Sequence, residues 1–351
     1  MALEDTKTIN SLQVLRGLAA LAVTAGHTFA FTDNAGLVAF FDDFVLPYTF
    51  GVDAFFVISG FIMYYTSREK FGAPGYPLNF FRKRIARIAP MYWLCTLVIG
   101  TIYLAFGQLD GDIVKSLLFI PYYAPDGHIY PVLGVGWTLN YEMLFYFIFG
   151  LSLFFRPALA IAFVTTTISA LVVLGYFIGS DNPVTWAWTR PIIMEFLFGV
   201  FIGIAYHKWG KTGNIWLALM LLALSIAIVP LTGYGIIPTI AFYDPRALQA
   251  VLLVFACASL IPWSWESRTP AFLIYLGNIS YALYLVHPIV VRALKAVFKF
   301  DMPNSDVLGA IFIMLGITAS IVAAHFMHNY FEKPVTAWLS GTRKRPIVQP
   351  T

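Results

Sequence analysis

The sequence predicts an all-α membrane protein: a polytopic transmembrane helical bundle of about ten spans, with both termini in the cytoplasm. The first of three observations is composition. Hydrophobic residues make up 59% of the 351 residues, charged residues only 11%, and the mean hydropathy is +0.76. Soluble domains carry about 25% charged residues, and so few charges would leave large apolar patches in water. The composition therefore predicts contact with a lipid bilayer, and it excludes a disordered chain or a nucleic-acid partner.

The second observation is a series of ten apolar runs, each close to the roughly 20 residues that cross a bilayer. The runs lie near residues 9–31, 47–66, 88–106, 135–155, 157–179, 190–208, 213–231, 247–262, 271–292 and 306–328. The eighth run is short, so we expect it to be tilted or re-entrant, and residues 112–121 are typical of a half-helix at the surface. We predict one membrane domain over residues 1–351, with spans from about 9 to 328 and a cytoplasmic tail at 329–351.

The third observation is the distribution of lysine and arginine, which favours the cytoplasmic side of membrane proteins. With the N-terminus in the cytoplasm, Arg16 lies within a span and 15 of the 22 Lys and Arg residues face inward. The six that face outward are Lys115, Arg190, Arg246, Arg292, Lys295 and Lys299. This asymmetry predicts the N-in and C-in topology. Arg292, Lys295 and Lys299, which share one predicted outer loop, oppose that topology.

Ionisable residues within the predicted spans are candidates for function, because a charge at bilayer depth costs several kcal/mol. Arg16 and His27 lie on one face of the first span, roughly 16 Å apart along its axis. Counting about 1.5 Å per residue from the outer span ends places five groups in one layer, about 6–10 Å deep. These five are His27, Asp53, Glu142, Glu195 and His287. The sequence thus predicts a polar site near the outer face, with Arg16 beneath it.

Plainer interpretations of these residues stay open. Asp53 and Glu195 could each serve as a helix-packing partner for a tyrosine, tryptophan or arginine, and His287 could make an interhelical hydrogen bond. His27 is the strongest catalytic candidate, because it shares a helix face with Arg16. Trp137 opens the fourth span as a belt residue would, whereas Asn140, three residues later, is unusual there.

Two further clusters lie on the predicted cytoplasmic side. Arg84 and Arg87 share a helix face, so they could bind phosphate or simply anchor the span. The second cluster contains His325, His328 and Glu332, at a spacing that could ligate a metal. Since no further ligand accompanies it, we predict no metal site. Cys95 and Cys257 lie in apolar runs and are typical of small buried hydrophobic residues.

Five motifs occur in a fixed order between residues 9 and 335. They are LQVLRGLAALAVTAGH at the first span, GVDAFFVISGFIM (51–63), RKRIARIAPMYW (82–93), GVGWTLNYEMLFY (134–146) and LGNISYALYLVHPIV (276–290). Together they resemble the motifs of the acyltransferase-3 family of integral-membrane acyltransferases. The WTLNYEM segment is most similar to exopolysaccharide acetyltransferases that modify succinoglycan-type repeats. Some family members carry a C-terminal SGNH domain, which we expect to be absent here.

The resemblance implies a cell inner membrane enzyme with acyl-CoA, in our expectation acetyl-CoA, as a cytosolic donor substrate and no tightly bound cofactor. It implies a sugar hydroxyl of a glycan or lipid-linked oligosaccharide as acceptor. Arg16, Arg84 and Arg87 would hold the donor phosphates, and His27 would act as general base.

The remaining roles follow from the same resemblance. Glu142 or Asp53 would orient the imidazole, Asn140 or Tyr281 would donate to the oxyanion, and Trp137, Glu195 and His287 would contact substrate. A covalent acyl-histidine stays open. So do a transporter or flippase for a lipid-linked glycan and an acyltransferase acting on a lipid or small metabolite.

Overall fold

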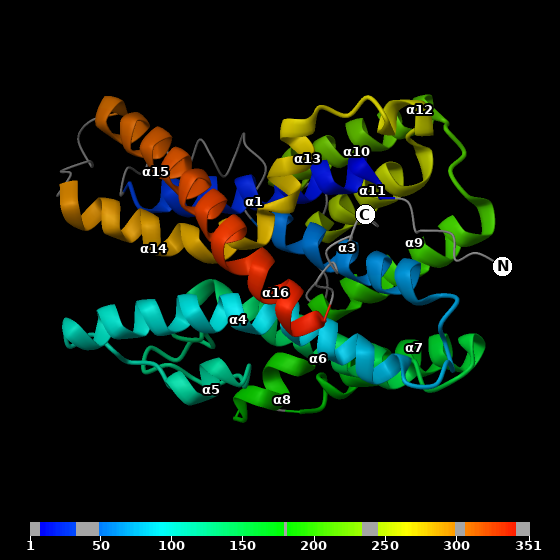
Figure 1. The fold of residues 1–351 in the computed structure, drawn as a ribbon, viewed down its shortest axis with the longest axis horizontal. Helices are drawn as coiled ribbons and strands as arrows, with labels where there is room; N and C mark the ends of the chain where they lie inside the picture. The colour runs from blue at the N-terminus through cyan, green and yellow to red at the C-terminus, as the bar shows by residue number, and fades with distance from the viewer. Residues whose placement is uncertain (1–7, 33–48, 179–180, 234–244, 299–305, 342–351) are drawn as a thin grey trace, which may run out of the picture.

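The computed structural model describes residues 8–32, 49–178, 181–233, 245–298 and 306–341, and it contains only helices and connecting segments over these ranges (Figure 1). The first half of the chain forms α1 (Asn10–Ala30), α3 (Thr49–Ser67), α4 (Tyr76–Ala105), α5 (Ile113–Leu117), a 3-10 turn (Gly134–Gly136), α6 (Trp137–Ser152) and α7 (Pro157–Leu174). The middle forms α8 (Pro183–Trp188), a 3-10 turn (Pro191–Ile193), α9 (Met194–Trp209), α10 (Ile215–Gly233) and α11 (Pro245–Phe255). The last part forms a π-helical turn (Ala256–Leu260), α12 (Trp263–Glu266), α13 (Ala271–Asn278), α14 (Ser280–Phe298), α15 (Asp306–Met327), a second π-helical turn (His328–Glu332) and α16 (Lys333–Ser340). The all-α prediction is confirmed over these residues.

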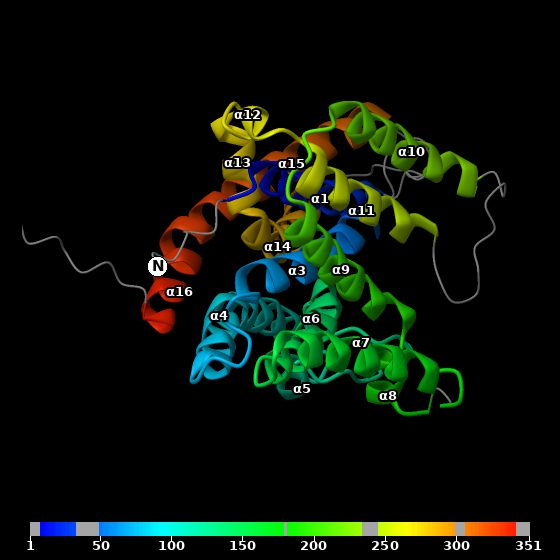
Figure 2. The same cartoon turned by 90° about the vertical axis from the view of Figure 1, so that its right-hand side faces the viewer.

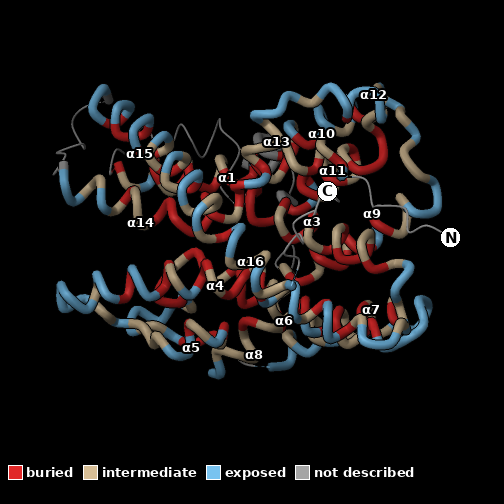
Figure 3. The backbone as a smooth tube through the Cα atoms, viewed as in Figure 1, coloured by how far each residue is buried: buried red, intermediate tan, exposed pale blue. Residues whose placement is uncertain are grey.

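Helix α3 occupies the middle of the bundle. In both views it lies between a group that contains α1, α11, α14 and α15 and a group that contains α4, α6 and α7, with α9 beside it (Figures 1 and 2). Buried residues concentrate on the helix faces that meet in the interior, while exposed residues line the outside (Figure 3). Many exposed side chains are nevertheless large and apolar, Leu104, Phe177, Trp216 and Val307 among them. An apolar exterior of this kind is suited to lipid.

Five helices in the described part of the chain are long and apolar enough to cross a membrane. They span Phe50–Ser67, Tyr76–Ala105, Pro157–Leu174, Pro191–Trp209 and Val307–Ser340. The pair α13 and α14 adds a sixth if its two parts, bent by 66°, count as one span. Shorter apolar helices cover Ile215–Ile228 and Ala247–Leu260. The protein is therefore a multi-pass membrane protein, while the count of ten spans and the direction of the termini stay predictions.

Two helices extend beyond the apolar runs that predicted them. The third run was expected to start near residue 88, but α4 begins at Tyr76 and includes Arg84 and Arg87. The tenth run continues through the π-helical turn into α16 as far as Ser340. Arginine, lysine and glutamate form helices well, so a helix can continue where hydropathy stops. Residues 328–340 are thus helical and pack on α4, where the Arg82 Nε donates to the Leu339 carbonyl over 2.8 Å.

A buried ion pair ties the start of α1 to the segment after α9. Lys211 Nζ lies 2.6 Å from Glu266 Oε1, and both side chains are almost completely buried. The Ser11 backbone N–H donates to the other carboxylate oxygen over 2.9 Å, and Lys211 also donates to the Ile261 carbonyl over 2.9 Å. A buried pair is tolerated when its remaining donors and acceptors are satisfied in this way. Sequence analysis did not predict this pair, because Lys211 and Glu266 lie 55 residues apart in the chain.

The closest helix packing is between α3 and α9, and glycines make it possible. A Cβ at Gly60 would lie 1.9 Å from the Phe196 carbonyl oxygen, and one at Gly199 would lie 2.0 Å from the Val57 carbonyl oxygen. Gly203 faces Tyr64 further along, so the two helices run parallel. Small residues at helix interfaces allow such close approach in membranes. The parallel direction is the one expected for the second and sixth predicted spans.

We expect Gly60→Ala to lower the apparent melting temperature of the detergent-solubilised protein. The added methyl group meets backbone atoms of α9 and must push the helices apart, and overpacking of this kind costs about 1–3 kcal/mol. Fluorescence-detected thermal unfolding measures the effect. Gly134→Ala is the matched control, because nothing lies within 4 Å of a Cβ at that position. Equal melting temperatures for the two variants would contradict the packing described.

Candidate active site

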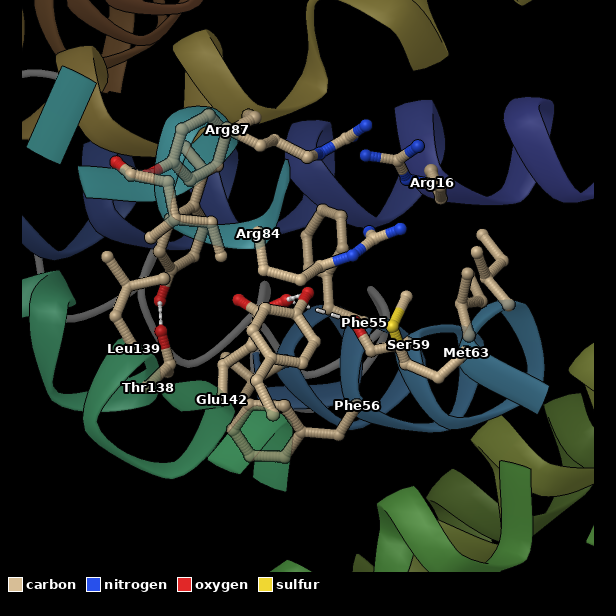
Figure 4. Close-up of a pocket in the computed structure, with 17 residues that line it drawn as sticks. Arg16, Phe55, Phe56, Ser59, Met63, Arg84, Arg87, Thr138, Leu139 and Glu142 are labelled. Carbon is tan, nitrogen blue, oxygen red and sulfur yellow. Dashed lines mark hydrogen bonds between the residues drawn. The ribbon is translucent and has the colours of Figure 1, made fainter. Parts of the chain in front are cut away.

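A cavity of about 90 Å³ lies among α1, α3, α4, α6 and α14 (Figure 4). One wall is apolar, with Phe55, Ile62 and Met63 from α3. The polar residues that line it are Arg16, Ser59, Arg84, Arg87, Thr138, Glu142, Tyr146, Tyr281 and Tyr284. The cavity therefore combines an apolar wall with several charged groups, which is the usual character of a ligand site.

Glu142 is the carboxylate of this cavity, and two hydroxyl groups hold it in place. Ser59 on α3 donates to its Oε1 over 3.1 Å, and the Tyr146 hydroxyl donates a short hydrogen bond to the same oxygen (Figure 4). Tyr146 lies four residues after Glu142, so the two side chains meet on one face of α6. These bonds fix the carboxylate toward the cavity.

Three arginines line the same cavity as that carboxylate. The Arg84 guanidinium stacks over the rings of Phe80 and Tyr146, at 5.5 Å and 5.8 Å from their centroids, and its buried Nε has no hydrogen-bond partner among the described residues. The Arg16 and Arg87 guanidinium groups approach each other on the same side of the cavity (Figure 4).

None of the three arginines forms an ion pair with a carboxylate in the described part of the chain. The cavity thus holds three positive charges and one negative charge. Half-buried charges need a partner, and planar guanidinium donors suit phosphate or carboxylate. The arrangement can therefore bind an anion, which is compatible with the phosphate-binding interpretation of Arg84 and Arg87.

His27 and His287 form a separate pair at the other end of α1. His27 Nδ1 lies 3.1 Å from His287 Nε2 and 3.0 Å from the Val23 carbonyl oxygen. His287 is completely buried, and its Nδ1 lies 3.0 Å from the Leu283 carbonyl oxygen. Because a carbonyl oxygen can only accept, the proton of each neutral ring is on Nδ1. The Nε2 of His27 then carries a lone pair, as a general base requires.

The single polar layer expected from the sequence stays a prediction, since Glu142 alone of its five members lines this cavity. Glu142 shares its cavity with Arg16, which lies roughly 16 Å along α1 from His27 by helical rise. Depth counting assumed that all spans begin at one level and run perpendicular to the membrane, whereas real spans differ in tilt and length. Helix α6 has only 16 residues and begins deep in the bundle, where a Cβ at Gly136 would lie 2.5 Å from the Tyr92 ring. The expected role of Glu142 in orienting His27 therefore stays a prediction.

The other acidic candidates lie away from the cavity lining. Asp53 on α3 and Glu195 on α9 are buried, with 7% and 3% of their surfaces exposed. Both remain candidates at the crowded α3–α9 interface, where either a structural or a catalytic role is compatible with burial.

The three remaining polar candidates have different surroundings. The Tyr281 hydroxyl lines the cavity but donates to the Ile88 carbonyl over 2.7 Å, so it must exchange that bond to serve an oxyanion. The buried Asn140 Oδ1 has no hydrogen-bond partner among the described residues. Trp137 presents its ring edge-on to Tyr141 at 5.9 Å.

The possible metal ligands of the sequence have separate partners. His325 Nδ1 lies 2.7 Å from the Tyr275 hydroxyl, and His328 Nδ1 lies 2.8 Å from Glu332 Oε2. Within the described ranges, no group of three His, Cys, Asp or Glu side chains is placed to hold a metal ion.

Several polar residues of the site were missed in the sequence. The Tyr284 hydroxyl donates to the Val135 carbonyl over 3.0 Å and lies 2.9 Å from the Thr138 hydroxyl, which joins α14 to the start of α6. Tyr146 could have been found from its position four residues after Glu142. Ser59 gave no signal, because a lone serine in an apolar span is ordinary.

The fold and the site define a multi-pass membrane protein whose core holds a pair of histidines and a cavity lined by three arginines and one carboxylate. Comparison with known proteins identifies its class: the chain belongs to the acyltransferase-3 family, described as "Acyltransferase domain", which matches residues 9–331. Arg16, His27, Glu142 and His287 all lie within the matched range.

Three relatives illustrate the range of this family. The chain is 36% identical over 304 residues to the exopolysaccharide production protein ExoZ of Rhizobium meliloti (strain 1021), across 83% of this chain and 93% of ExoZ. It is 26% identical to the acyltransferase MdmB of Streptomyces mycarofaciens, across 96% of this chain and 93% of MdmB. It is 22% identical to the O-acetyltransferase OatA of Staphylococcus aureus (strain NCTC 8325 / PS 47), across 81% of this chain but 52% of OatA. No solved structure matches the chain.

We expect Glu142→Gln to lower the apparent melting temperature of the protein. The substitution keeps the size of the side chain but leaves three guanidinium groups without a counter-charge, and it weakens hydrogen bonds to a charged acceptor worth about 1.5–3 kcal/mol. Glu69→Gln serves as control, because that side chain is 67% exposed. A Glu142→Gln protein as stable as the Glu69→Gln protein would show that the cavity does not depend on this carboxylate.

Proposed function

We propose that the protein is an O-acyltransferase of the cell inner membrane that transfers an acetyl group from cytosolic acetyl-CoA to a hydroxyl group of an extracytoplasmic or lipid-linked polysaccharide. The observation that carries the proposal is the arrangement along α1. Arg16 lines an anion-binding cavity, and His27 presents an imidazole base roughly 16 Å further along the same helix face. An anionic donor with a long flexible arm can occupy both positions at once.

The names of the relatives support the substrate class. ExoZ is named for exopolysaccharide production, and OatA is an O-acetyltransferase. The match to ExoZ spans nearly the whole of that protein, so the similarity is not limited to one motif. We therefore extend to this chain the transfer of an acetyl group to a polysaccharide hydroxyl.

The proposed donor site is the arginine cavity. The phosphates of acyl-CoA would contact Arg84, Arg87 and Arg16, whose positive charges exceed the single negative charge of Glu142. The apolar wall formed by Phe55, Ile62 and Met63 would pack against the pantetheine arm. In this arrangement the negative charge of Glu142 partly offsets the positive charge of the arginines while no donor is bound. This role differs from the orientation of His27 that the sequence predicted for Glu142.

The proposed reaction is direct transfer with His27 as general base. Its Nε2 would remove the proton of the sugar hydroxyl as the oxygen forms a bond to the thioester carbonyl carbon. The carbon–sulfur bond then breaks, and the same proton goes to the departing CoA thiolate. Asp53, Trp137, Asn140, Glu195 and Tyr281 remain proposed contacts for the acceptor or the oxyanion.

Two related reactions differ from this proposal in what they form. A covalent mechanism would place the acetyl group on His27 Nε2 before the sugar arrives, and it would leave a labelled protein when the acceptor is withheld. An acyltransferase for a lipid or small metabolite, as the breadth of the family allows, would label a different product. Membership of an acyltransferase family favours both over a glycan transporter.

A labelling experiment tests the function. Two sets of membranes from the source organism, one from a strain that lacks the gene and one from the same strain complemented with it, would be incubated with acetyl-CoA carrying a radioactive acetyl group. We expect label in the alkali-labile ester fraction of the polysaccharide, and none in membranes without the gene. Label confined to small lipids or metabolites would refute the proposed acceptor class.

We expect His27→Ala to abolish transfer while the protein still folds. Loss of a general base lowers rates by about 10²–10⁴, and the residue is only half-buried, so its truncation should disturb packing little. The rate is measured in the complemented membranes and the folded state by thermal unfolding. A folded His27→Ala protein with wild-type turnover would remove His27 from the mechanism.

We expect Arg84→Ala and Arg87→Ala to raise the apparent KM for acetyl-CoA while the KM for the acceptor changes little. Each substitution removes a charge-assisted contact worth roughly 1.5–3 kcal/mol. Arg82→Ala is the matched control from the same helix, because Arg82 is exposed and does not line the cavity. If all three variants raise the KM alike, or if they invert the topology, the arginines act as a membrane anchor.

A further inference from the structure

His287 contacts His27, and its position differs from that of a substrate ligand. It is completely buried, and its two ring nitrogens are directed to the Leu283 carbonyl and to His27. The two rings lie 5.0 Å apart between centroids and are tilted by 39°. A residue enclosed in this way cannot reach a sugar or a thioester, but it can act on the ring that does.

We infer that His287 is the positioning residue of His27: it takes the place that a carboxylate occupies in a catalytic triad, and it serves as the reservoir for the second imidazole proton. The inference rests on the proposed function, since it concerns the base of the same reaction. It assigns to a second histidine the role that the sequence had given to Glu142 or Asp53.

Two backbone carbonyl groups determine which nitrogen of each imidazole ring carries the proton. The Leu283 carbonyl oxygen requires a proton on His287 Nδ1, so the Nε2 of the neutral ring has a lone pair, and that lone pair is directed at His27. The Val23 carbonyl oxygen likewise requires the proton of His27 to be on Nδ1. That proton is therefore shared between the Val23 carbonyl and His287 Nε2, and it holds the His27 ring in one orientation. The result is a ring whose basic nitrogen is Nε2.

The proton balance of the reaction explains why an acceptor at this position matters. When His27 Nε2 takes the hydroxyl proton, the ring becomes an imidazolium with a proton on each nitrogen. His287 Nε2, 3.1 Å from His27 Nδ1, can accept the Nδ1 proton, so the charge is spread over two rings. When His27 gives its Nε2 proton to the CoA thiolate, the Nδ1 proton returns from His287, and both rings are neutral again. No other reactant is consumed.

Glu142 is engaged by other groups. Its Oε1 is engaged by Ser59 and Tyr146, and it lines the cavity that contains Arg16. A neutral acceptor is also suited to a membrane-capable bundle, because two imidazoles avoid a permanent buried charge. The pair becomes charged only while the transferred proton is on it.

Two substitutions of His287 separate positioning from packing. His287→Leu fills a similar volume but offers no acceptor to His27 Nδ1, whereas His287→Gln restores an acceptor oxygen. Both would be assayed in the complemented membranes described above, with acetyl-CoA as donor and the endogenous polysaccharide as acceptor. His325→Leu is the matched control. His325 lies on α15, its ring is hydrogen-bonded to the Tyr275 hydroxyl, and it belongs to neither the cavity nor the histidine pair.

We expect His287→Leu to lower the maximal rate about tenfold or more, with an unchanged KM for acetyl-CoA and an unchanged amount of folded protein. His287→Gln should regain part of the lost rate, and His325→Leu should behave as wild type. A His287→Leu protein with the wild-type maximal rate would overturn the inference. The inference would also be overturned if the Leu and Gln variants had equal rates and both rates fell only in proportion to the amount of folded protein.

The outcomes also distinguish the inference from the proposed function. If His27→Ala is inactive and His287→Leu is fully active, the positioning role is wrong and the proposed function stands. If His27→Ala remains active, the base has been assigned wrongly, and the role of His287 fails with it.

Discussion

The rest of the structure depends on placing charged groups inside a bundle that lipid surrounds. Arg16 and His27 are carried by one helix, and each must be matched by groups from other helices. Around Arg16, helices α3, α4 and α6 supply Ser59, Arg84 and Glu142. Around His27, α14 supplies His287. The close contacts of α1 with α3 and α14 are thus the structural condition for both polar centres.

The arginine cavity and the histidine pair differ in their net charge, and this difference indicates what each can do. The arginine cavity keeps an excess of positive charge with one fixed carboxylate, which suits a ligand that brings negative charge with it. The histidine pair keeps no fixed charge and satisfies its donors through the Val23 and Leu283 carbonyls. A site of the first kind binds, and a site of the second kind can hold a proton briefly. Their separation along α1 would let one substrate occupy both.

Much of this could be predicted from the sequence, for identifiable reasons. Long apolar runs gave the helical class because hydropathy alone marks membrane-capable segments. The shared face of Arg16 and His27 followed from helical periodicity within one segment. The contact between His27 and His287 could not be derived, because it depends on how α1 and α14 pack, although both residues had been assigned to the same layer.

The failures share one cause, which is that sequence counting measures position along a helix and not between helices. The place of Glu142 relative to the histidines could not be derived from helical rise, because it depends on how α6 packs against α1 and α14. The helical extent of residues 76–87 and 328–340 was not predicted, because helix continues there through polar sequence. The Lys211–Glu266 pair was missed because its partners are 55 residues apart in the chain.

The central claim is that donor and acceptor reach the two ends of α1 from opposite sides of the membrane. The most direct test uses the purified protein in vesicles of one orientation, established by protease access to a C-terminal tag. Radiolabelled acetyl-CoA would be supplied to only one face, and de-acetylated polysaccharide from the source organism only to the other. The account predicts labelled polysaccharide when acetyl-CoA is on the face that exposes the C-terminus, and none in the reverse arrangement. Transfer that requires both substrates on the face of the C-terminus would contradict it.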